Sequence, residues 1–131
     1  MKALIILNHN PVEELLIDLK ENYGVENIEI LKETNENLAL KFGQIPITLK
    51  TKKELYDYIV KEMVSFVKER NYKVVVISGE PVVCKWVTIE LEKLGINCYA
   101  PLSKRESVDV KQSDGLVVKK AIFKYAGLRE F

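Results

Sequence analysis

The sequence lacks the patterns that mark most metal sites and disulfide-stabilised folds. It has two cysteines, Cys84 and Cys98, and one histidine, His9, with no CxxC pair. These numbers exclude the usual structural zinc patterns, and no group of His and carboxylate residues suits a hydrolytic metal. Both cysteines stand among apolar residues, so we expect buried thiols. We expect neither a metal nor a cofactor.

Long apolar runs and an excess of one charge are also missing. No segment is long enough to cross a bilayer, and the N-terminal apolar stretch is too short for a secretory signal. We therefore expect a cytoplasmic protein with no membrane partner. The formal net charge is +1, whereas affinity for DNA needs many phosphate contacts. DNA binding is not expected, although a few focused cations can still bind a small anion.

Apolar runs and helical patterns alternate along the 131 residues, which suit one domain. Strands are predicted at residues 3–7, 27–31, 73–79 and 96–100. Helices are predicted from Asn10, as an N-cap, to Gly24, over 36–42, from the capping box Thr51–Glu54 to residue 70, and over 80–94. A C-terminal β-hairpin over about 103–125, turning at Asp114-Gly115, extends a core of about residues 1–100.

This alternation predicts an α/β fold, a Rossmann-like open parallel sheet with flanking helices. The simplest order places the second strand on one side of the first, and the third and fourth strands on the other. The winding direction then reverses between the first and third strands. Open α/β sheets bind ligands at that point, beyond the carboxyl ends of the strands.

Three polar clusters are expected at this edge of the sheet: Asn8-His9-Asn10, Ser78-Gly79-Glu80 and Ser103-Lys104-Arg105. The first two precede predicted helices, whose N-terminal amides favour anions. Arginine offers a planar fork to phosphate oxygens and lysine a mobile point charge. Together the clusters predict a phosphate site. Each cluster also has a purely structural interpretation. Asn10 and Glu80 can be helix caps and His9 a surface imidazole. Ser78-Gly79 can be a tight turn, and Lys104-Arg105 a solvated corner.

No nucleophile elbow, GxGxxG or GxxxxGK[ST] pattern is present. The stretches "ILNHNPVEELLIDLKENYGVENIEIL" and "YAPLSKRESVDVKQSDGLVVKKAIFKYAGLREF" nevertheless resemble the small CRISPR-associated ring nucleases of type III systems, which are related to CARF (CRISPR-associated Rossmann fold) domains. The likeness spans nearly the whole chain, including "GQIP" and "VVVISGE". Its most specific part is a strand, then Ser-Lys-Arg, then a hairpin and a closing "LREF".

The resemblance implies a single CARF-like domain over residues 1–131 that forms a homodimer and binds cyclic oligoadenylate, most often the tetra-adenylate ring. It implies metal-independent opening of the ring, which ends antiviral signalling. Lys104, Arg105, His9 and Ser103 would be catalytic. The ligand would contact Asn8, Asn10, Ser78, Gly79, Glu80 and Arg129. The sequence departs from the family pattern at Leu102, Tyr125 and Pro81, where a hydroxyl residue, a nearby histidine and a small residue are expected.

Three functions fit these observations. The first is a ring nuclease in which the substrate's own ribose 2′-hydroxyl attacks the adjacent phosphorus and leaves a 2′,3′-cyclic phosphate. The second is a binding module that holds the cyclic messenger without cutting it. The third is an unrelated mononucleotide-binding α/β protein, which would show no preference for the cyclic ligand.

Overall fold

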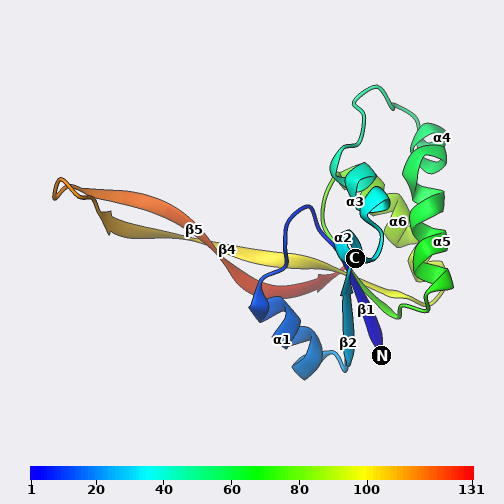
Figure 1. Ribbon diagram of the computed structural model, residues 1–131, viewed down its shortest axis with the longest axis horizontal. Coiled ribbons are helices and arrows are strands. Elements are labelled where there is room, and N and C mark those ends of the chain that lie inside the picture. The colour runs from blue at the N-terminus through cyan, green and yellow to red at the C-terminus, as the bar shows by residue number, and fades with distance from the viewer.

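A single mixed sheet organises the chain, and the computed structural model describes all of residues 1–131 (Figure 1). The strands are β1 (Lys2–Ile6), β2 (Asn27–Ile30), β3 (Val74–Ile77), β4 (Asn97–Lys111) and β5 (Val117–Glu130). The helices are α1 (Glu13–Asn22), α2 (Leu31–Thr34), α3 (Glu36–Gly43), α4 (Lys52–Leu55), the π-helical η1 (Tyr56–Val60), α5 (Lys61–Glu69) and α6 (Pro81–Lys93).

The strand order is β2-β1-β3-β4-β5. The first four strands are parallel, and β5 runs antiparallel to β4. This confirms the predicted α/β class and the predicted order of the first four strands. The winding direction reverses between β1 and β3, so their carboxyl ends form the edge at which a ligand site is expected.

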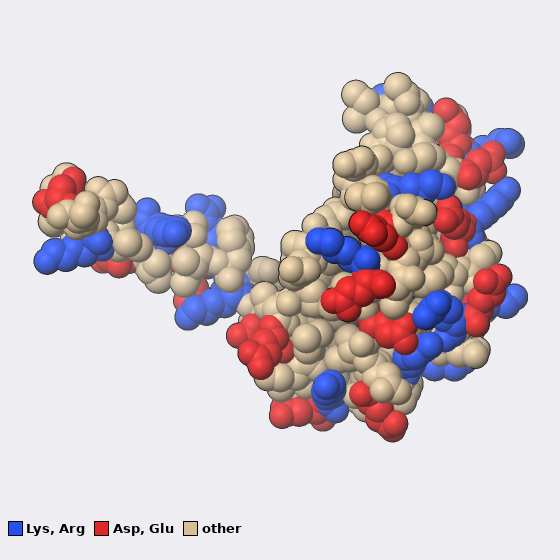
Figure 2. Space-filling view, in the orientation of Figure 1, with Lys and Arg blue, Asp and Glu red and all other residues tan.

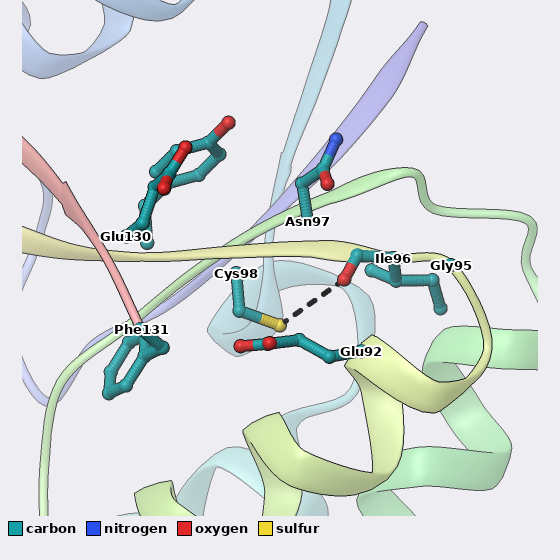
Figure 3. A pocket seen from close by; sticks show the side chains of 8 residues that line it. Glu92, Gly95, Ile96, Asn97, Cys98, Glu130 and Phe131 are labelled. Carbon is teal, nitrogen blue, oxygen red and sulfur yellow. Dashed lines mark hydrogen bonds between the residues drawn. The ribbon is translucent and has the colours of Figure 1, made fainter.

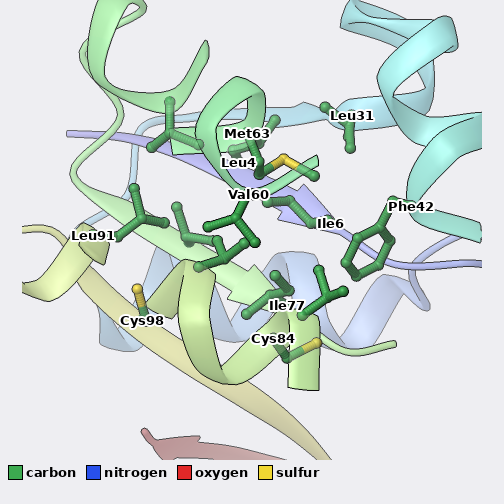
Figure 4. Close-up of a cluster of buried hydrophobic side chains, with 14 of the residues drawn as sticks. Leu4, Ile6, Leu31, Phe42, Val60, Met63, Ile77, Cys84, Leu91 and Cys98 are labelled. Atoms are coloured by element: carbon green, nitrogen blue, oxygen red, sulfur yellow. The ribbon is translucent and has the colours of Figure 1, made fainter. Parts of the chain in front are cut away.

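The two central strands are buried on both faces, which explains their continuous apolar runs. Alternate residues of β1 and β3 face opposite layers. Leu4, Ile6 and Ile77 pack under α3, η1, α5 and α6 in the larger core cluster (Figure 4). Ala3, Ile5 and Val76 pack on the other face against α1. Helices therefore cover both faces of the central sheet.

The helix boundaries follow local chemistry except at the start of α1. The capping box of Thr51 and Glu54 is present, and α4, η1 and α5 continue from it as the predicted long helix. The prediction of Asn10 as the N-cap of α1 is wrong: Val12 precedes Glu13 and has an extended backbone at φ −75° and ψ 153°. Pro11 sets the geometry of the loop but does not begin the helix.

The prediction that the fourth strand ends near Ala100 is wrong. β4 continues to Lys111 because β5 pairs with it from Tyr99 to Lys111, with one register shift between Leu102 and Ser103. The two strands leave the body together as a long twisted ribbon (Figure 1). The predicted hairpin turn is confirmed: Asp114 accepts a hydrogen bond from the backbone amide of Leu116 at 2.9 Å.

A polar network closes the amino-terminal edge of the sheet. The buried Tyr72 donates a hydrogen bond to Glu29 Oε1 at 2.6 Å, and Lys2 and Arg70 form ion pairs with the same carboxylate at 3.6 and 3.5 Å. The Tyr72 hydroxyl, above all, lowers the pKa of Glu29, and the two cations add to this. The ionised carboxylate therefore stabilises the contact between β2 and the turn before β3.

Replacing Tyr72 with Phe should lower the free energy of unfolding at pH 7 by about 1.5–3 kcal/mol, because a hydrogen bond to a charged group is lost. Since the folded-state pKa of Glu29 is lowered, its stabilising effect is present above about pH 4.5 and is lost as the pH falls through the folded value. The difference between Tyr72→Phe and the natural protein should therefore shrink below about pH 4.5. Denaturant unfolding at several pH values measures it. Tyr58→Phe, at a half-buried tyrosine not bonded to a carboxylate, is the control; an equal loss there would contradict the assignment.

Candidate functional site

A cleft of about 440 Å³ opens at the carboxyl ends of β1 and β3, beside the base of the ribbon. It brings together one residue from each of the three predicted polar clusters: His9, Ser78 and Ser103. Apolar and aromatic side chains complete its wall: Leu7, Val12, Leu15, Pro101, Leu102, Phe123 and Tyr125. The three segments are far apart in the sequence, and the reversal of winding between β1 and β3 brings the first two to the same edge.

His9 is exposed, and its ring is oriented by its own loop. Nδ1 lies 2.9 Å from the carbonyl oxygen of Asn10. A carbonyl can only accept, so Nδ1 carries the proton in this contact, and Nε2 is left as the nitrogen that can take one up. Geometry thus makes His9 suitable as a proton acceptor at the mouth of the cleft.

Asn8 and Asn10 line a second, adjoining hollow of about 260 Å³, which His9 also borders. Its far wall comes from α2 and α3 and the residues that follow them, including Lys32, Glu36 and Gln44. These three polar residues were not among the predicted site residues, because nothing in their local sequence links them to the carboxyl edge of the sheet. Only the folding of α2 and α3 over β1 brings them there.

Gly79 is required by close packing at the turn after β3. A Cβ placed on it would lie 2.5 Å from Cζ of the buried Phe42 and 3.5 Å from the side-chain amide nitrogen of Asn8. A Cβ placed on Gly43 would lie 3.5 Å from Oδ1 of Asn8, an ordinary van der Waals contact. The missing side chain at Gly79 therefore makes room for the Phe42 ring, beside the Asn8 amide at the end of β1.

The Ser103-Lys104-Arg105 cluster lies within β4 rather than in a turn, so the interpretation of this segment as a turn or corner is wrong. A strand sends adjacent residues to opposite faces. Ser103 pairs with Tyr125 and Arg105 with Phe123, on the face that borders the cleft. Lys104 lies on the opposite face, where its ammonium is 4.0 Å from Glu106. Of this cluster only Ser103 lines the cleft; strand alternation places Arg105 on the same face of the ribbon and Lys104 on the other.

The remaining two predicted residues also lie outside the cleft. Glu80 caps α6, accepting a hydrogen bond from the backbone amide of Val83 at 2.8 Å, as its structural interpretation predicted. Arg129 pairs with Ala100 in the sheet and is exposed. Tyr99 and Leu128, on either side of this pair, pack toward α1, so Arg129 lies on the face nearer α6.

Tyr125 is the functional candidate that sequence reasoning missed. Its hydroxyl donates to Asp18 Oδ2 of α1 at 2.6 Å, which fixes the base of the ribbon against the body. Burial, together with the Asp18 carboxylate, raises its pKa. Tyr125 therefore stays neutral and forms a fixed aromatic wall of the cleft.

A separate hollow of about 240 Å³ lies at the other end of the sheet, where β4 begins and the chain ends (Figure 3). Cys98 points into it toward the carbonyl oxygen of Ile96, at 3.8 Å. Desolvation raises the pKa of Cys98 to about 12 and that of Cys84 to about 11. Both thiols are buried, as predicted, and stay protonated.

No group of three His, Cys, Asp or Glu side chains is placed to hold a metal ion. None of the helices combines the length and the apolar character needed to cross a membrane.

The family model described as the uncharacterized protein MJ1673 family matches residues 1–129. The chain belongs to this family. No curated protein and no solved structure matches it. The match to the MJ1673 family covers both the body and the ribbon, so the ribbon is part of the family pattern.

Replacing Gly79 with Ala should destabilise the protein by about 1–3 kcal/mol, because the new methyl group overlaps the Phe42 ring in a packed core. In the double variant Gly79→Ala/Phe42→Leu the ring is replaced by a smaller side chain. Its loss of unfolding free energy should therefore be smaller than the sum of the losses in the two single variants. Thermal or denaturant unfolding of the four proteins of this cycle measures the coupling. Strict additivity would show that the two residues do not compete for the same space.

Proposed function

We propose that this protein is a metal-independent ring nuclease that binds and linearises cyclic oligoadenylate, with the tetra-adenylate ring as its preferred substrate. In this proposal the domain is CARF-like, acts in the cytoplasm as a homodimer, and ends type III CRISPR antiviral signalling. The observation that carries it is the meeting of His9, Ser78 and Ser103 in one cleft at the switch point of an open parallel sheet.

The charge distribution supports a cyclic anion rather than a long nucleic acid. The whole chain is close to neutral, while Arg105 extends from the ribbon on the face that borders the cleft. A two-fold dimer would supply each cation twice, which suits a ring with rotational symmetry. Lys104, from the opposite face, would add to the potential around the site without lining the cleft.

Ring opening by the substrate's own 2′-hydroxyl needs no nucleophile from the protein. The protein has to hold the 2′-oxygen in line with the phosphorus and the departing 5′-oxygen. The ribose 2′-oxygen forms a bond to the adjacent phosphorus while the bond from phosphorus to the 5′-oxygen breaks, giving a 2′,3′-cyclic phosphate. His9 Nε2 takes the proton of the 2′-hydroxyl and returns it to the departing 5′-oxygen. Arg105 offsets the negative charge that grows on the phosphate, and Ser103 and Ser78 hold its oxygens by hydrogen bonds. Asn8 and Asn10, from the adjoining hollow, and Gly79 complete the proposed ligand contacts; Glu80 and Arg129, expected there from the sequence, lie outside the cleft and are left out of this arrangement.

The second candidate is a protein that sequesters the cyclic messenger without cutting it. One observation favours it: within the cleft, His9 is the single group suited to proton transfer, and it is exposed. Tight positioning of the phosphates serves binding and cleavage equally, so the product decides between the two functions.

Incubation of the protein with labelled cyclic tetra-adenylate in the presence of EDTA should yield linear product ending in a 2′,3′-cyclic phosphate, read by chromatography and mass spectrometry. An intact ring bound with high affinity would establish the binding protein instead. Equal, weak affinity for the cyclic ring and for AMP would contradict both proposals and favour a mononucleotide-binding protein.

Arg105→Ala should weaken binding of the ring by at least about tenfold, because a charge-assisted contact to phosphate is removed. Lys119→Ala is the matched control, since Lys119 lies on the same face of the ribbon nearer the tip. Lys104→Ala should have a smaller effect than Arg105→Ala. Equilibrium binding measures all three, and equal losses would show that charge alone matters, not position.

His9→Ala should slow ring opening by about 100-fold or more while changing affinity little, because proton transfer is removed and the phosphate contacts remain. Single-turnover kinetics and binding, measured on the same preparation, separate the two effects. If rate and affinity fall together, His9 is a contact residue.

A further inference from the structure

The hollow beside the cleft, of about 260 Å³, combines apolar and polar side chains from the ends of β1 and β2 and from α2 and α3. Its apolar lining consists of Leu7, Ile30, Ala39 and Leu40. Leu40 is 55% exposed, so part of this apolar surface is open to a ligand. Five polar side chains surround the same space: Asn8, Asn10, Lys32, Glu36 and Gln44. An apolar surface with a few convergent polar groups is typical of a small-molecule site.

The polar side chains of the hollow have no partners within the chain. None of the five takes part in a side-chain hydrogen bond or an ion pair, whereas the nearby Asn35 caps α3 and Lys41 forms an ion pair with Glu62. Lys32 and Glu36 carry opposite charges and still do not pair with each other. Their donors and acceptors are therefore available to a molecule that enters the hollow.

Charge separates the role of the hollow from that of the cleft. The hollow has one cation, Lys32, and one carboxylate, Glu36, so its lining is balanced in charge. The carboxylate opposes any anion in this space. The cleft has no carboxylate in its lining and offers the hydroxyl groups of Ser78 and Ser103. Basic side chains also follow the ribbon that leaves the cleft (Figure 2). A phosphate therefore fits the cleft, and an uncharged polar ring fits the hollow.

The two spaces are neighbours that share the loop after β1. Leu7 and His9 line both of them. In Figure 1 this loop passes between the base of the ribbon and helices α2 and α3. Pockets for larger ligands hold about 300–1,000 Å³, so the hollow alone suits part of a nucleotide, whereas the hollow and the cleft together suit a whole one. A nucleotide that occupies both spaces has to lie across His9.

The position of His9 fits the middle of such a nucleotide. The ribose joins the base to the phosphate and carries the 2′-hydroxyl. With the base in the hollow and the phosphate in the cleft, the ribose lies over His9, whose Nδ1 is bonded to the carbonyl oxygen of Asn10 and whose Nε2 is free. The nitrogen that can accept a proton then faces the hydroxyl that has to lose one.

We propose that the hollow is a base subsite that takes one adenine of the cyclic oligoadenylate. The amides of Asn8, Asn10 and Gln44 donate to ring nitrogens and accept from the 6-amino group, as Asn and Gln side chains do when they read adenine. Glu36 accepts a hydrogen bond from the same amino group, and Leu40 packs on the face of the ring. The identity of the base rests on the proposed function; the subsite adds Glu36, Gln44 and Leu40 to its ligand contacts.

Adenosine is the probe for the subsite, because it has the base and the ribose but no phosphate and cannot be opened. In NMR titrations of the isotope-labelled protein, the side-chain amide signals of Asn8 and Gln44 and the backbone amide signal of Gly43 should shift. Signals that stay unchanged at millimolar adenosine, or shifts confined to other parts of the chain, would overturn the proposal.

Inosine tests how the base is read. It carries a carbonyl oxygen in place of the 6-amino group, so the Glu36 carboxylate would face a second acceptor, and inosine should bind about tenfold more weakly than adenosine. Glu36→Gln should remove this discrimination, because an amide can also donate to that oxygen. Binding of inosine or guanosine as tight as that of adenosine to the natural protein would overturn the assignment of adenine, as would discrimination that persists in Glu36→Gln.

Filling the hollow tests its use by the cyclic ligand. Gly43 ends α3, and a Cβ placed on it contacts only Oδ1 of Asn8, at 3.5 Å. Gly43→Leu should therefore weaken the affinity for adenosine and for cyclic tetra-adenylate by about tenfold or more, because the added side chain occupies ligand space. The thermal unfolding midpoint should stay or rise, since a glycine is replaced in a helix. Asn37→Leu adds the same side chain to α3 outside the hollow and should leave both affinities unchanged.

The outcomes separate the subsite from ring opening. Unchanged affinities in Gly43→Leu would overturn the subsite, even in a protein that opens the ring. Adenosine bound in the hollow of a protein that leaves the ring intact would support the subsite and contradict the nuclease.

Discussion

The parallel pairing of β1 with β3 is the constraint on which the rest of the structure depends. Ala3 to Ile6 pair in register with Val74 to Ile77, and both strands are buried on both faces. The crossover from β1 to β2 goes one way and the crossover to β3 the other, so the loops after β1 and β3 emerge side by side. The cleft, its histidine and the glycine after β3 all follow from that arrangement.

Packing at this edge also explains why the site has its present form. Phe42 fills the space above the turn at Gly79, and the Asn8 amide lies beside it. The capping role of Glu80 begins α6 immediately afterwards, which leaves Ser78 at the cleft and turns Glu80 away from it. Ser78 and Glu80, two positions apart, therefore have different roles because one directly follows a strand and the other caps a helix.

Much of the fold was predictable because its signals are local. The apolar runs of β1 and β3, the capping box at Thr51 and the hairpin turn at Asp114-Gly115 each depend on residues close in sequence. The path of the chain after Ala100 was not predictable in this way. Pro101 suggested the end of a strand, but the hydrogen bonds that extend β4 come from β5, and this pairing is a tertiary effect.

The candidate site was predictable at the level of segments and less so at the level of side chains. All three polar segments do reach the cleft, each through one residue. The separation of Lys104 from Arg105 follows from strand alternation, which appears only once the segment is known to be a strand. Tyr125 and Lys32 were missed because their positions depend on how the ribbon and α2 pack against the body.

The register shift between Leu102 and Ser103 has a mechanical consequence. It lies where the ribbon leaves the body, directly beside a cleft residue, and bulged positions are where a strand bends most easily. An arm of about 30 Å turns a tilt of about 10° at its base into a displacement of about 5 Å at its tip. A small change of backbone angle around Ser103 would therefore be amplified along the ribbon and would move the Asp114-Gly115 turn furthest.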